Sequence, residues 1–210
     1  MTKQEKVLKI IERLQKVYPH AKIALNFENP FQLLIATILA AQSTDVGVNL
    51  ATPELFKQYP TPQKMAEASR EDLDHYITKV NFHWNKTRLI KEASEMIVEK
   101  FAGEVPHTMK ELDSLPGVAR KTANVVLSCA FGQPEGIIID THMIRMSQRL
   151  GLSSAKDPVK IEQDLMEIVP KQHWVDFPLM LILHGRHFCV AKPHSCEGCP
   201  LEDLCPDMKK

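Results

Sequence analysis

Apolar residues recur along this chain at steps of three and four positions, the spacing that places side chains on one face of an α-helix. Near the N-terminus the pattern joins Val7, Ile10, Ile11, Leu14 and Val17. A later stretch repeats it with Leu89, Ile90, Ala93, Met96, Ile97 and Phe101. Period-two alternation is nearly absent, and its one candidate, the isoleucines at 137–139, is too short to found a sheet. The sequence therefore predicts an all-α fold of about ten helices.

Several prolines stand directly behind a residue that caps helices, and each such pair predicts a helix start. Proline at the first helical position loses no hydrogen bond, because an amide at that position has no partner within the helix. The pairs are Asn29-Pro30, Thr52-Pro53, Thr61-Pro62 and Asp157-Pro158. Helices are therefore predicted to begin at these four prolines.

Hydropathy and charge exclude some classes of protein. The longest apolar stretch covers residues 31–41 and is interrupted by Gln32 and Thr37. Because a membrane-spanning helix needs roughly 18 or more apolar residues, no membrane span is expected. The charged first residues lack the apolar core of a signal peptide, which predicts a cytoplasmic protein. Lysine and arginine total 26, as do aspartate and glutamate, so a nucleic-acid site would have to be a local patch.

Four of the five cysteines are clustered near the end of the chain, at Cys189, Cys196, Cys199 and Cys205. In a reducing cytoplasm a disulfide framework is not expected, so the cluster indicates a metal or iron–sulfur site. Four thiolates suit tetrahedral zinc and a [4Fe–4S] cluster alike, and spacing alone leaves both open. Cys129 stands in an apolar run and is interpreted as a small buried hydrophobe.

The pattern of residues 111–126 predicts a helix, a tight turn at Pro116-Gly117, and a second helix. The second helix would open with backbone N–H groups and the positive end of its dipole, an arrangement that binds phosphate without side-chain charge. The alternative is a plain helical corner, and the Pro-Gly pair alone favours that alternative.

Three separated motifs in one order carry a resemblance to a known family. They are Leu115-Pro-Gly-Val-Ala-Arg-Lys-Thr-Ala-Asn124, Ile139-Asp-Thr-His142 and the terminal cysteine spacing, with Asn26-Phe27 and Ala40-Ala-Gln-Ser-Thr-Asp45 nearer the start. Together they resemble the endonuclease III family, DNA repair glycosylases with a helix-hairpin-helix motif. The resemblance implies two domains: a six-helix barrel over 22–132, with the hairpin at about 108–130, and an iron–sulfur cluster domain from 1–21 and 133–210.

Two residues are the candidates for catalysis. Lys121 would lie in the first turn of a helix beside Arg120, where the helix dipole disfavours the ammonium and makes the free amine more available. Most lysines at such a position are surface residues or phosphate contacts; the resemblance implies instead the catalytic nucleophile. Asp140 is by pattern an N-cap. The resemblance adds that its carboxylate stabilises positive charge developing at the sugar C1′.

The resemblance also implies the cofactor and the contacts with DNA. It assigns the four clustered cysteines to a [4Fe–4S] cluster, which leaves His184, His187 and His194 as core or surface histidines. The loop 190–195, whose one fixed charge is Lys192, would touch DNA phosphates. Gln42 would fill the gap left by an extruded nucleotide. The DNA-contacting residues implied are Gln42, Phe82, Leu115, Gly117, Val118, Ala119, Arg120 and Lys192.

Phe82 is the residue in this set with a direct competing interpretation. By position it would be the wedge that enters the base stack opposite Gln42. Alternatively, Phe82 and Trp84 are loop aromatics packed on the barrel.

The resemblance implies a bifunctional DNA glycosylase and AP lyase that removes oxidised pyrimidines through a lysine Schiff base and β-elimination. The alternatives are a mismatch-specific glycosylase on the same scaffold and a non-catalytic iron–sulfur DNA-binding protein. The expected partner is double-stranded DNA with damaged bases or abasic sites, with no membrane partner. The protein is expected to act as a monomer that associates with the nucleoid when bound to DNA.

Overall fold

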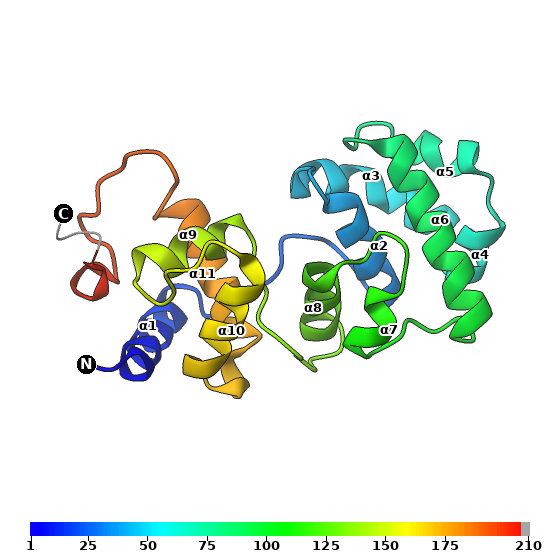
Figure 1. The fold of residues 1–210 in the computed structure, drawn as a ribbon. Helices are drawn as coiled ribbons and strands as arrows, with labels where there is room; N and C mark the ends of the chain where they lie inside the picture. Colours follow the sequence, from blue (N-terminus) through cyan, green and yellow to red (C-terminus); the bar gives the residue numbers. More distant parts are fainter. Residues whose placement is uncertain (207–210) are drawn as a thin grey trace. The chain divides into compact units, whose positions relative to one another are not determined.

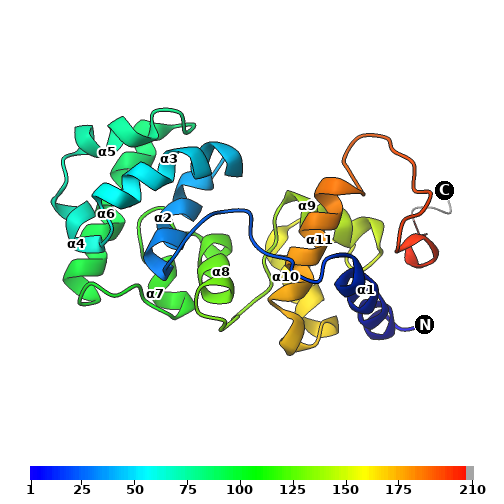
Figure 2. The same ribbon diagram turned by 180° about the vertical axis from the view of Figure 1, so that it is seen from behind.

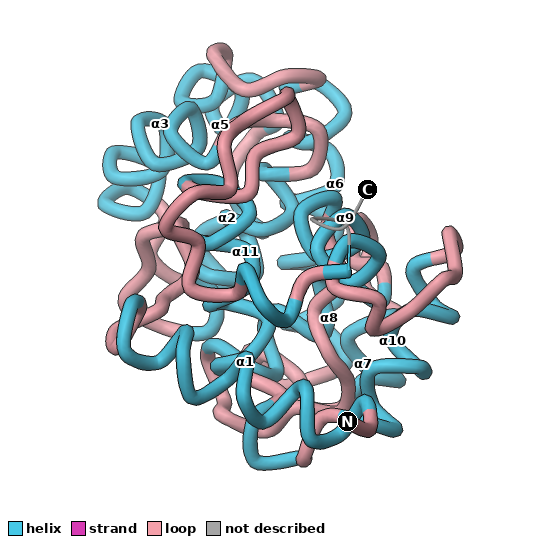
Figure 3. The backbone as a smooth tube through the Cα atoms, turned by 90° about the vertical axis from the view of Figure 1, so that its left-hand side faces the viewer, coloured by secondary structure: helices cyan, strands magenta, loops and turns pink. Residues whose placement is uncertain are grey.

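The computed structural model describes residues 1–206, and these contain eleven α-helices, two short 3-10 helices and no strand (Figures 1 and 3). The all-α prediction is confirmed. The chain divides into two compact units, the terminal unit, residues 1–22 and 134–210, and the central unit, residues 23–133. No helix within the described residues is both long and apolar enough to cross a membrane.

The terminal unit joins the start of the chain to its later part. Its helices are α1 (Lys3–Val17), α9 (Thr141–Arg149), α10 (Pro158–Ile168) and α11 (Asp176–His187), with η1 (Lys171–His173) and η2 (Glu202–Leu204). α1 starts at a capping box in which Thr2 and Glu5 satisfy each other's backbone N–H groups. Arg13 of α1 pairs with Asp203 and donates to the Pro200 carbonyl at 3.0 Å, which attaches the C-terminal segment to α1.

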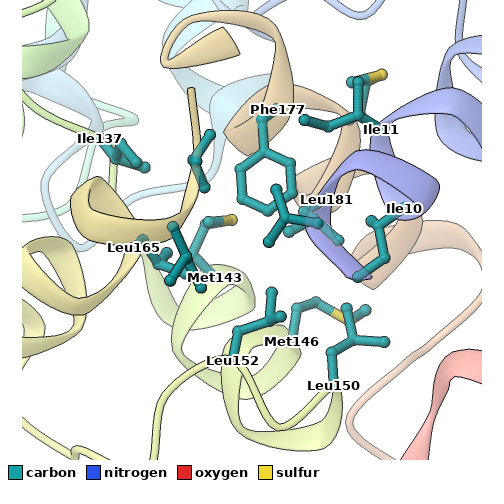
Figure 4. Packing of buried hydrophobic residues seen from close by; sticks show 14 of the residues in the cluster. Ile10, Ile11, Ile137, Met143, Met146, Leu150, Leu152, Leu165, Phe177 and Leu181 are labelled. Carbon is teal, nitrogen blue, oxygen red and sulfur yellow. The ribbon is translucent and has the colours of Figure 1, made fainter. Parts of the chain in front are cut away.

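The core of the terminal unit lies between α1, α9, α10 and α11 (Figure 4). The apolar stripe of α1 is fully or almost fully buried at Val7, Ile10, Ile11 and Leu14. Ile10 and Ile11 pack in the same cluster as Phe177, which is fully buried. Each such side chain contributes about 1.5–3 kcal/mol on burial, so the helical stripe is what joins the N-terminus to this unit.

The central unit is a single run of helices (Figure 2). They are α2 (Pro30–Ala40), α3 (Asp45–Gln58), α4 (Pro62–Glu67), α5 (Arg70–Ile77), α6 (His83–Lys100), α7 (Met109–Asp113) and α8 (Arg120–Cys129). α2 is buried along nearly its whole length and contacts α3, α6 and α8. An all-round apolar helix of this kind belongs in the centre of its unit.

Three of the four proline pairs mark helix starts as predicted, at Pro30, Pro62 and Pro158. The prediction for Thr52-Pro53 is wrong, because Pro53 lies inside α3. α3 instead begins at Asp45, where the Thr44 hydroxyl accepts from the Gly47 N–H at 3.1 Å. Residues buried on both sides of Pro53, among them Val48 and Leu55, keep the helix continuous, so packing outweighs the lost hydrogen bond.

Candidate functional site

The predicted hairpin is present as a helix, a turn and a helix (Figure 1). α7 ends at Asp113, and the Val118 N–H donates to the Leu115 carbonyl at 3.1 Å to close the turn before α8 begins at Arg120. Leu115 and Val118 are buried, whereas the neighbouring residues Gly117, Ala119 and Arg120 are exposed. Apolar packing of the two buried side chains therefore fixes the turn in place.

Gly117 is required at the tip of this turn for two reasons. Its φ of +78° lies in the left-handed region that other residues rarely adopt. A Cβ atom at this position would also lie 3.2 Å from both Ile38 Cγ2 and Leu89 Cβ, tighter than normal packing. The glycine therefore lets the turn lie directly against α2 and α6.

The first turn of α8 has no side-chain cap. Its N-cap residue is Ala119, which has no side-chain oxygen, whereas Thr108 caps the partner helix α7 by accepting from Glu111 N. The positive end of the α8 dipole is therefore not covered by a capping side chain. Lys121 is the second residue of this helix, and its side chain is exposed to solvent.

Asp140 is the N-cap of α9, as its position in the sequence predicted. Its Oδ1 accepts a hydrogen bond from the Met143 N–H at 2.8 Å, and the residue is half-buried. The isoleucines at 137–139 are buried directly before it and fix where the carboxylate emerges. Lys121 belongs to the central unit and Asp140 to the terminal unit.

Gln42 and Phe82 lie on two loops that hydrogen bonds bring together. Asn81 Nδ2 donates to the Gln42 carbonyl at 2.8 Å, and the Asn81 N–H donates to Ser43 Oγ at 3.1 Å. Gln42 and Phe82 both have left-handed backbones, with φ of +53° and +58°. Such conformations are uncommon for side chains of this size and concentrate at functional sites.

The structure decides against the packed interpretation of the two loop aromatics. The exposed fraction is 64% for Phe82 and 58% for Trp84, so neither side chain is covered by the central unit. Phe82 is the N-cap residue of α6, and Trp84 lies in the first turn of that helix. Phe82 is therefore exposed next to the Gln42 loop.

Side chains behind these loops were not singled out from the sequence. Lys86, one turn into α6, is buried and donates to the Leu39 carbonyl and to Ser43 Oγ, each at 2.7 Å. Asp74 of α5 is buried and accepts from His83 and Thr87 of α6. The sequence does indicate that Lys86 is buried, because it lies four positions before Ile90 and therefore on the buried stripe of α6.

All four clustered cysteines line one cavity of the terminal unit, together with Arg149, His184, Phe188 and His194. None of the four forms a disulfide. Burial and the neighbouring Cys189, Cys196 and Cys205 together raise the pKa of the Cys199 thiol. Arg149 Nη1 donates to Cys189 Sγ at 3.0 Å, and the Leu201 N–H donates to Cys199 Sγ at 3.4 Å.

Within residues 1–206, no three His, Cys, Asp or Glu side chains are grouped to hold a single metal ion.

The histidines around this cavity differ in their surroundings. His184 is 1% exposed and stacks on Phe188, and burial lowers the pKa of His184 to about 4, so it is neutral at physiological pH. His194 donates from Nδ1 to the Lys192 carbonyl at 2.8 Å, while its Nε2 is buried without a hydrogen-bond partner among the described residues. Lys192 itself is exposed, on the loop 190–195.

Comparison with known proteins agrees with this geometry. Residues 35–171 match the HhH-GPD superfamily of base excision DNA repair proteins. Endonuclease III from Synechocystis sp. is 47% identical over 208 residues, which cover 99% of this chain and 95% of that protein.

Solved structures of endonuclease III extend the similarity to the fold. A non-covalent endonuclease III–DNA complex has a TM-score of 0.92 at 41% identity, covering 100% of this chain and 97% of that chain. A trapped endonuclease III–DNA covalent intermediate has a TM-score of 0.91 at 42% identity, covering 100% and 98% of the two chains. In sequence and in fold, over nearly its whole length, this chain belongs to the endonuclease III family of the HhH-GPD base excision DNA repair proteins.

Proposed function

We propose that this protein is a DNA glycosylase and AP lyase of base excision repair, acting on oxidised pyrimidines in duplex DNA. The observation that carries the proposal is the match in sequence and fold to endonuclease III, including a covalently trapped DNA intermediate of that protein. An exposed lysine on an uncapped helix start supplies a nucleophile of the kind that such an intermediate needs.

In this proposal the hairpin binds the DNA backbone through the start of α8. The backbone at Gly117, Val118, Ala119 and Arg120 approaches a phosphate, with Leu115 fixing the turn from below. Lys192 adds a second phosphate contact from the terminal unit. We assign the barrel and hairpin to the central unit and the cluster to the terminal unit.

The chemistry begins with a nucleotide extruded from the duplex, at a cost of a few kcal/mol. Gln42 and Phe82 fill the gap that it leaves. The neutral amine of Lys121 attacks the sugar C1′, the glycosidic bond breaks, and the base leaves with the bonding pair and takes up a proton. The Asp140 carboxylate stabilises the positive charge that develops on the sugar during this step.

The lyase step follows from the same covalent bond. Opening of the sugar ring leaves an iminium between Lys121 Nζ and C1′, which makes the C2′ proton acidic. Loss of that proton expels the 3′ phosphate and nicks the strand, and water then hydrolyses the imine and releases Lys121.

Reduction with borohydride tests this function directly. Wild-type protein mixed with a duplex that contains one abasic site should give a stable cross-linked product on denaturing gels, because borohydride reduces the iminium to an amine. A mismatch-specific monofunctional glycosylase or a non-catalytic DNA-binding protein would give no cross-link. The substrate range is then read from single-turnover excision of oxidised pyrimidines against a thymine mismatch.

We further propose that Cys189, Cys196, Cys199 and Cys205 hold a [4Fe–4S] cluster. Four free thiols line one cavity, but among the described residues no three of them converge on a single ion, whereas tetrahedral zinc needs all four sulfurs at about 2.3 Å from one point. When bound, the cluster would serve to fix the C-terminal segment and the loop 190–195.

The purified protein should be yellow-brown with broad absorption near about 400 nm, from thiolate-bound iron. Cys199→Ala should lose iron and colour. Cys129→Ala is the matched control, since burial raises the pKa of that thiol to about 11 and it lies in the central unit. Stoichiometric zinc without iron in protein from native cells would contradict the cluster.

Phe82→Ala should reduce excision from a duplex by about tenfold or more while changing excision from single-stranded DNA little, because only the duplex must be opened. Trp84→Ala removes an equally exposed aromatic two positions away and serves as the control. Equal losses on the two substrates for Phe82→Ala would assign its effect to packing. Gel filtration of the protein alone and with DNA tests the expectation that it acts as a monomer.

A further inference from the structure

Lys86 is buried at a position where lysine is costly. It is 3% exposed, and burial lowers the pKa of its ammonium to about 8. Both hydrogen-bond acceptors of the ammonium, the Leu39 carbonyl and Ser43 Oγ, are neutral. An ammonium buried against neutral groups is less favourable than an apolar side chain of similar length. Stability alone therefore does not explain a lysine here.

The two acceptors flank the Gln42 turn. Leu39 lies in the last turn of α2, and Ser43 directly follows Gln42. The negative end of the α2 dipole favours an ammonium at the Leu39 carbonyl, so this contact stabilises the charged form of Lys86. Lys86 thus joins the first turns of α6 to both sides of the turn that presents Gln42.

Ser43 is the point where two connections meet. Its hydroxyl oxygen accepts from Lys86 Nζ at 2.7 Å and from the Asn81 N–H at 3.1 Å, and Asn81 Nδ2 also holds the Gln42 carbonyl. Asn81 directly precedes Phe82. The left-handed backbones of Gln42 and Phe82 are therefore held on either side of one hydrogen-bonded core.

An adjacent face of α6 makes a separate set of contacts. Thr87 donates to Asp74 Oδ1 at 3.0 Å, and His83 Nδ1 lies 2.6 Å from the same oxygen. These contacts attach the start of α6 to α5 and leave the Gln42 loop untouched. The side chains of Lys86, Asn81 and Ser43 supply hydrogen bonds that connect the start of α6 and the Phe82 loop to the Gln42 loop.

We propose that Lys86 is a positioning residue that sets the spacing of Gln42 and Phe82, so that both enter the gap left by an extruded nucleotide. The inference rests on the proposed glycosylase function and assigns Lys86 to duplex opening. Lys86 is buried and contributes no contact to the reacting atoms. Its loss should therefore affect excision only where a base stack must be opened.

Lys86→Met tests the proposal, because methionine keeps the apolar length of the side chain and removes the ammonium. The matched control is Lys91→Met on the same helix. Lys91 Nζ also donates to backbone carbonyls, those of Ala66 and Ala68, but these lie at α4 and away from both loops. Each variant removes an ammonium that hydrogen-bonds α6 to a neighbouring segment, but only Lys86→Met removes the contacts with the Gln42 turn.

Two measurements separate positioning from general destabilisation. One is single-turnover excision of one damaged base in duplex and in single-stranded DNA. The other is the fluorescence of 2-aminopurine placed beside the lesion, which rises when the stack opens. For Lys86→Met the ratio of duplex to single-strand excision should fall by about tenfold with a reduced fluorescence rise. For Lys91→Met both readouts should match the wild type.

Ser43→Ala provides an independent test if Lys86→Met does not fold, since it removes the shared acceptor from a half-buried surface position. It should lower the same ratio in the same direction. An unchanged ratio in Ser43→Ala, or equal ratios in Lys86→Met and Lys91→Met, would overturn the proposal. Absence of excision and trapping in the wild type would instead overturn the proposed function, so the two failures are distinguishable.

Discussion

Lys121→Ala should abolish borohydride trapping and strand nicking while the protein still binds abasic DNA. The Schiff base forms on the Lys121 amine, so removing that amine prevents the covalent intermediate from forming. Binding should persist because the hairpin meets phosphate through the start of α8, whose backbone does not depend on this side chain. Trapping yield on a gel and affinity by fluorescence anisotropy measure the two effects separately.

Lys110→Ala is the matched control for this change. Lys110 is an exposed lysine of α7 on the same hairpin, so its loss removes the same charge without touching the start of α8. It should keep full trapping, with at most a weaker affinity for DNA at low salt. A Lys121→Ala protein that forms the adduct at the wild-type rate would show that another amine is the nucleophile.

Asp140→Asn should slow base release by a factor of about 100 or more, comparable to the loss of one preorganised electrostatic group. Asparagine keeps an oxygen that accepts from the Met143 N–H, and it caps helices about as well as aspartate. The melting temperature should therefore stay close to that of the wild type. Nicking of a pre-formed abasic site should suffer less, because no glycosidic bond remains to be broken.

Asp157→Asn controls for the structural part of this change. Asp157 caps α10 in the same unit and accepts from the Lys160 N–H at 3.1 Å, so the substitution makes the same chemical change at another cap. It should leave single-turnover excision unchanged. Equal rates in the two variants would confine Asp140 to capping and remove it from the chemistry.

The local features of this protein are readable from its sequence because they depend on neighbours within one turn of helix. The stripe on α1 predicts its buried face, Asp140 predicts the cap of α9, and Pro116-Gly117 predicts the turn before α8. Each follows from contacts three or four positions apart, which any window of the sequence contains.

Pro53 is a position where neighbouring residues in the sequence do not predict the structure. A threonine followed by proline has the pattern of a helix start, and a few residues of context do not distinguish it from a proline inside a helix. The buried residues of α3 on both sides of Pro53 decided the outcome, and their burial depends on helices elsewhere in the central unit.

The Gln42 and Phe82 loops illustrate what only the tertiary structure decided. The sequence alone determined that this protein is helical, where its hairpin turns, and that Asn29, Thr61, Asp140 and Asp157 cap helices. It could not determine that Phe82 is exposed, or that Lys86 is buried against the Gln42 turn, because these residues are about forty positions apart. Contacts at that separation exist only once helices have packed, since packing chooses which loops meet and which polar groups must satisfy one another.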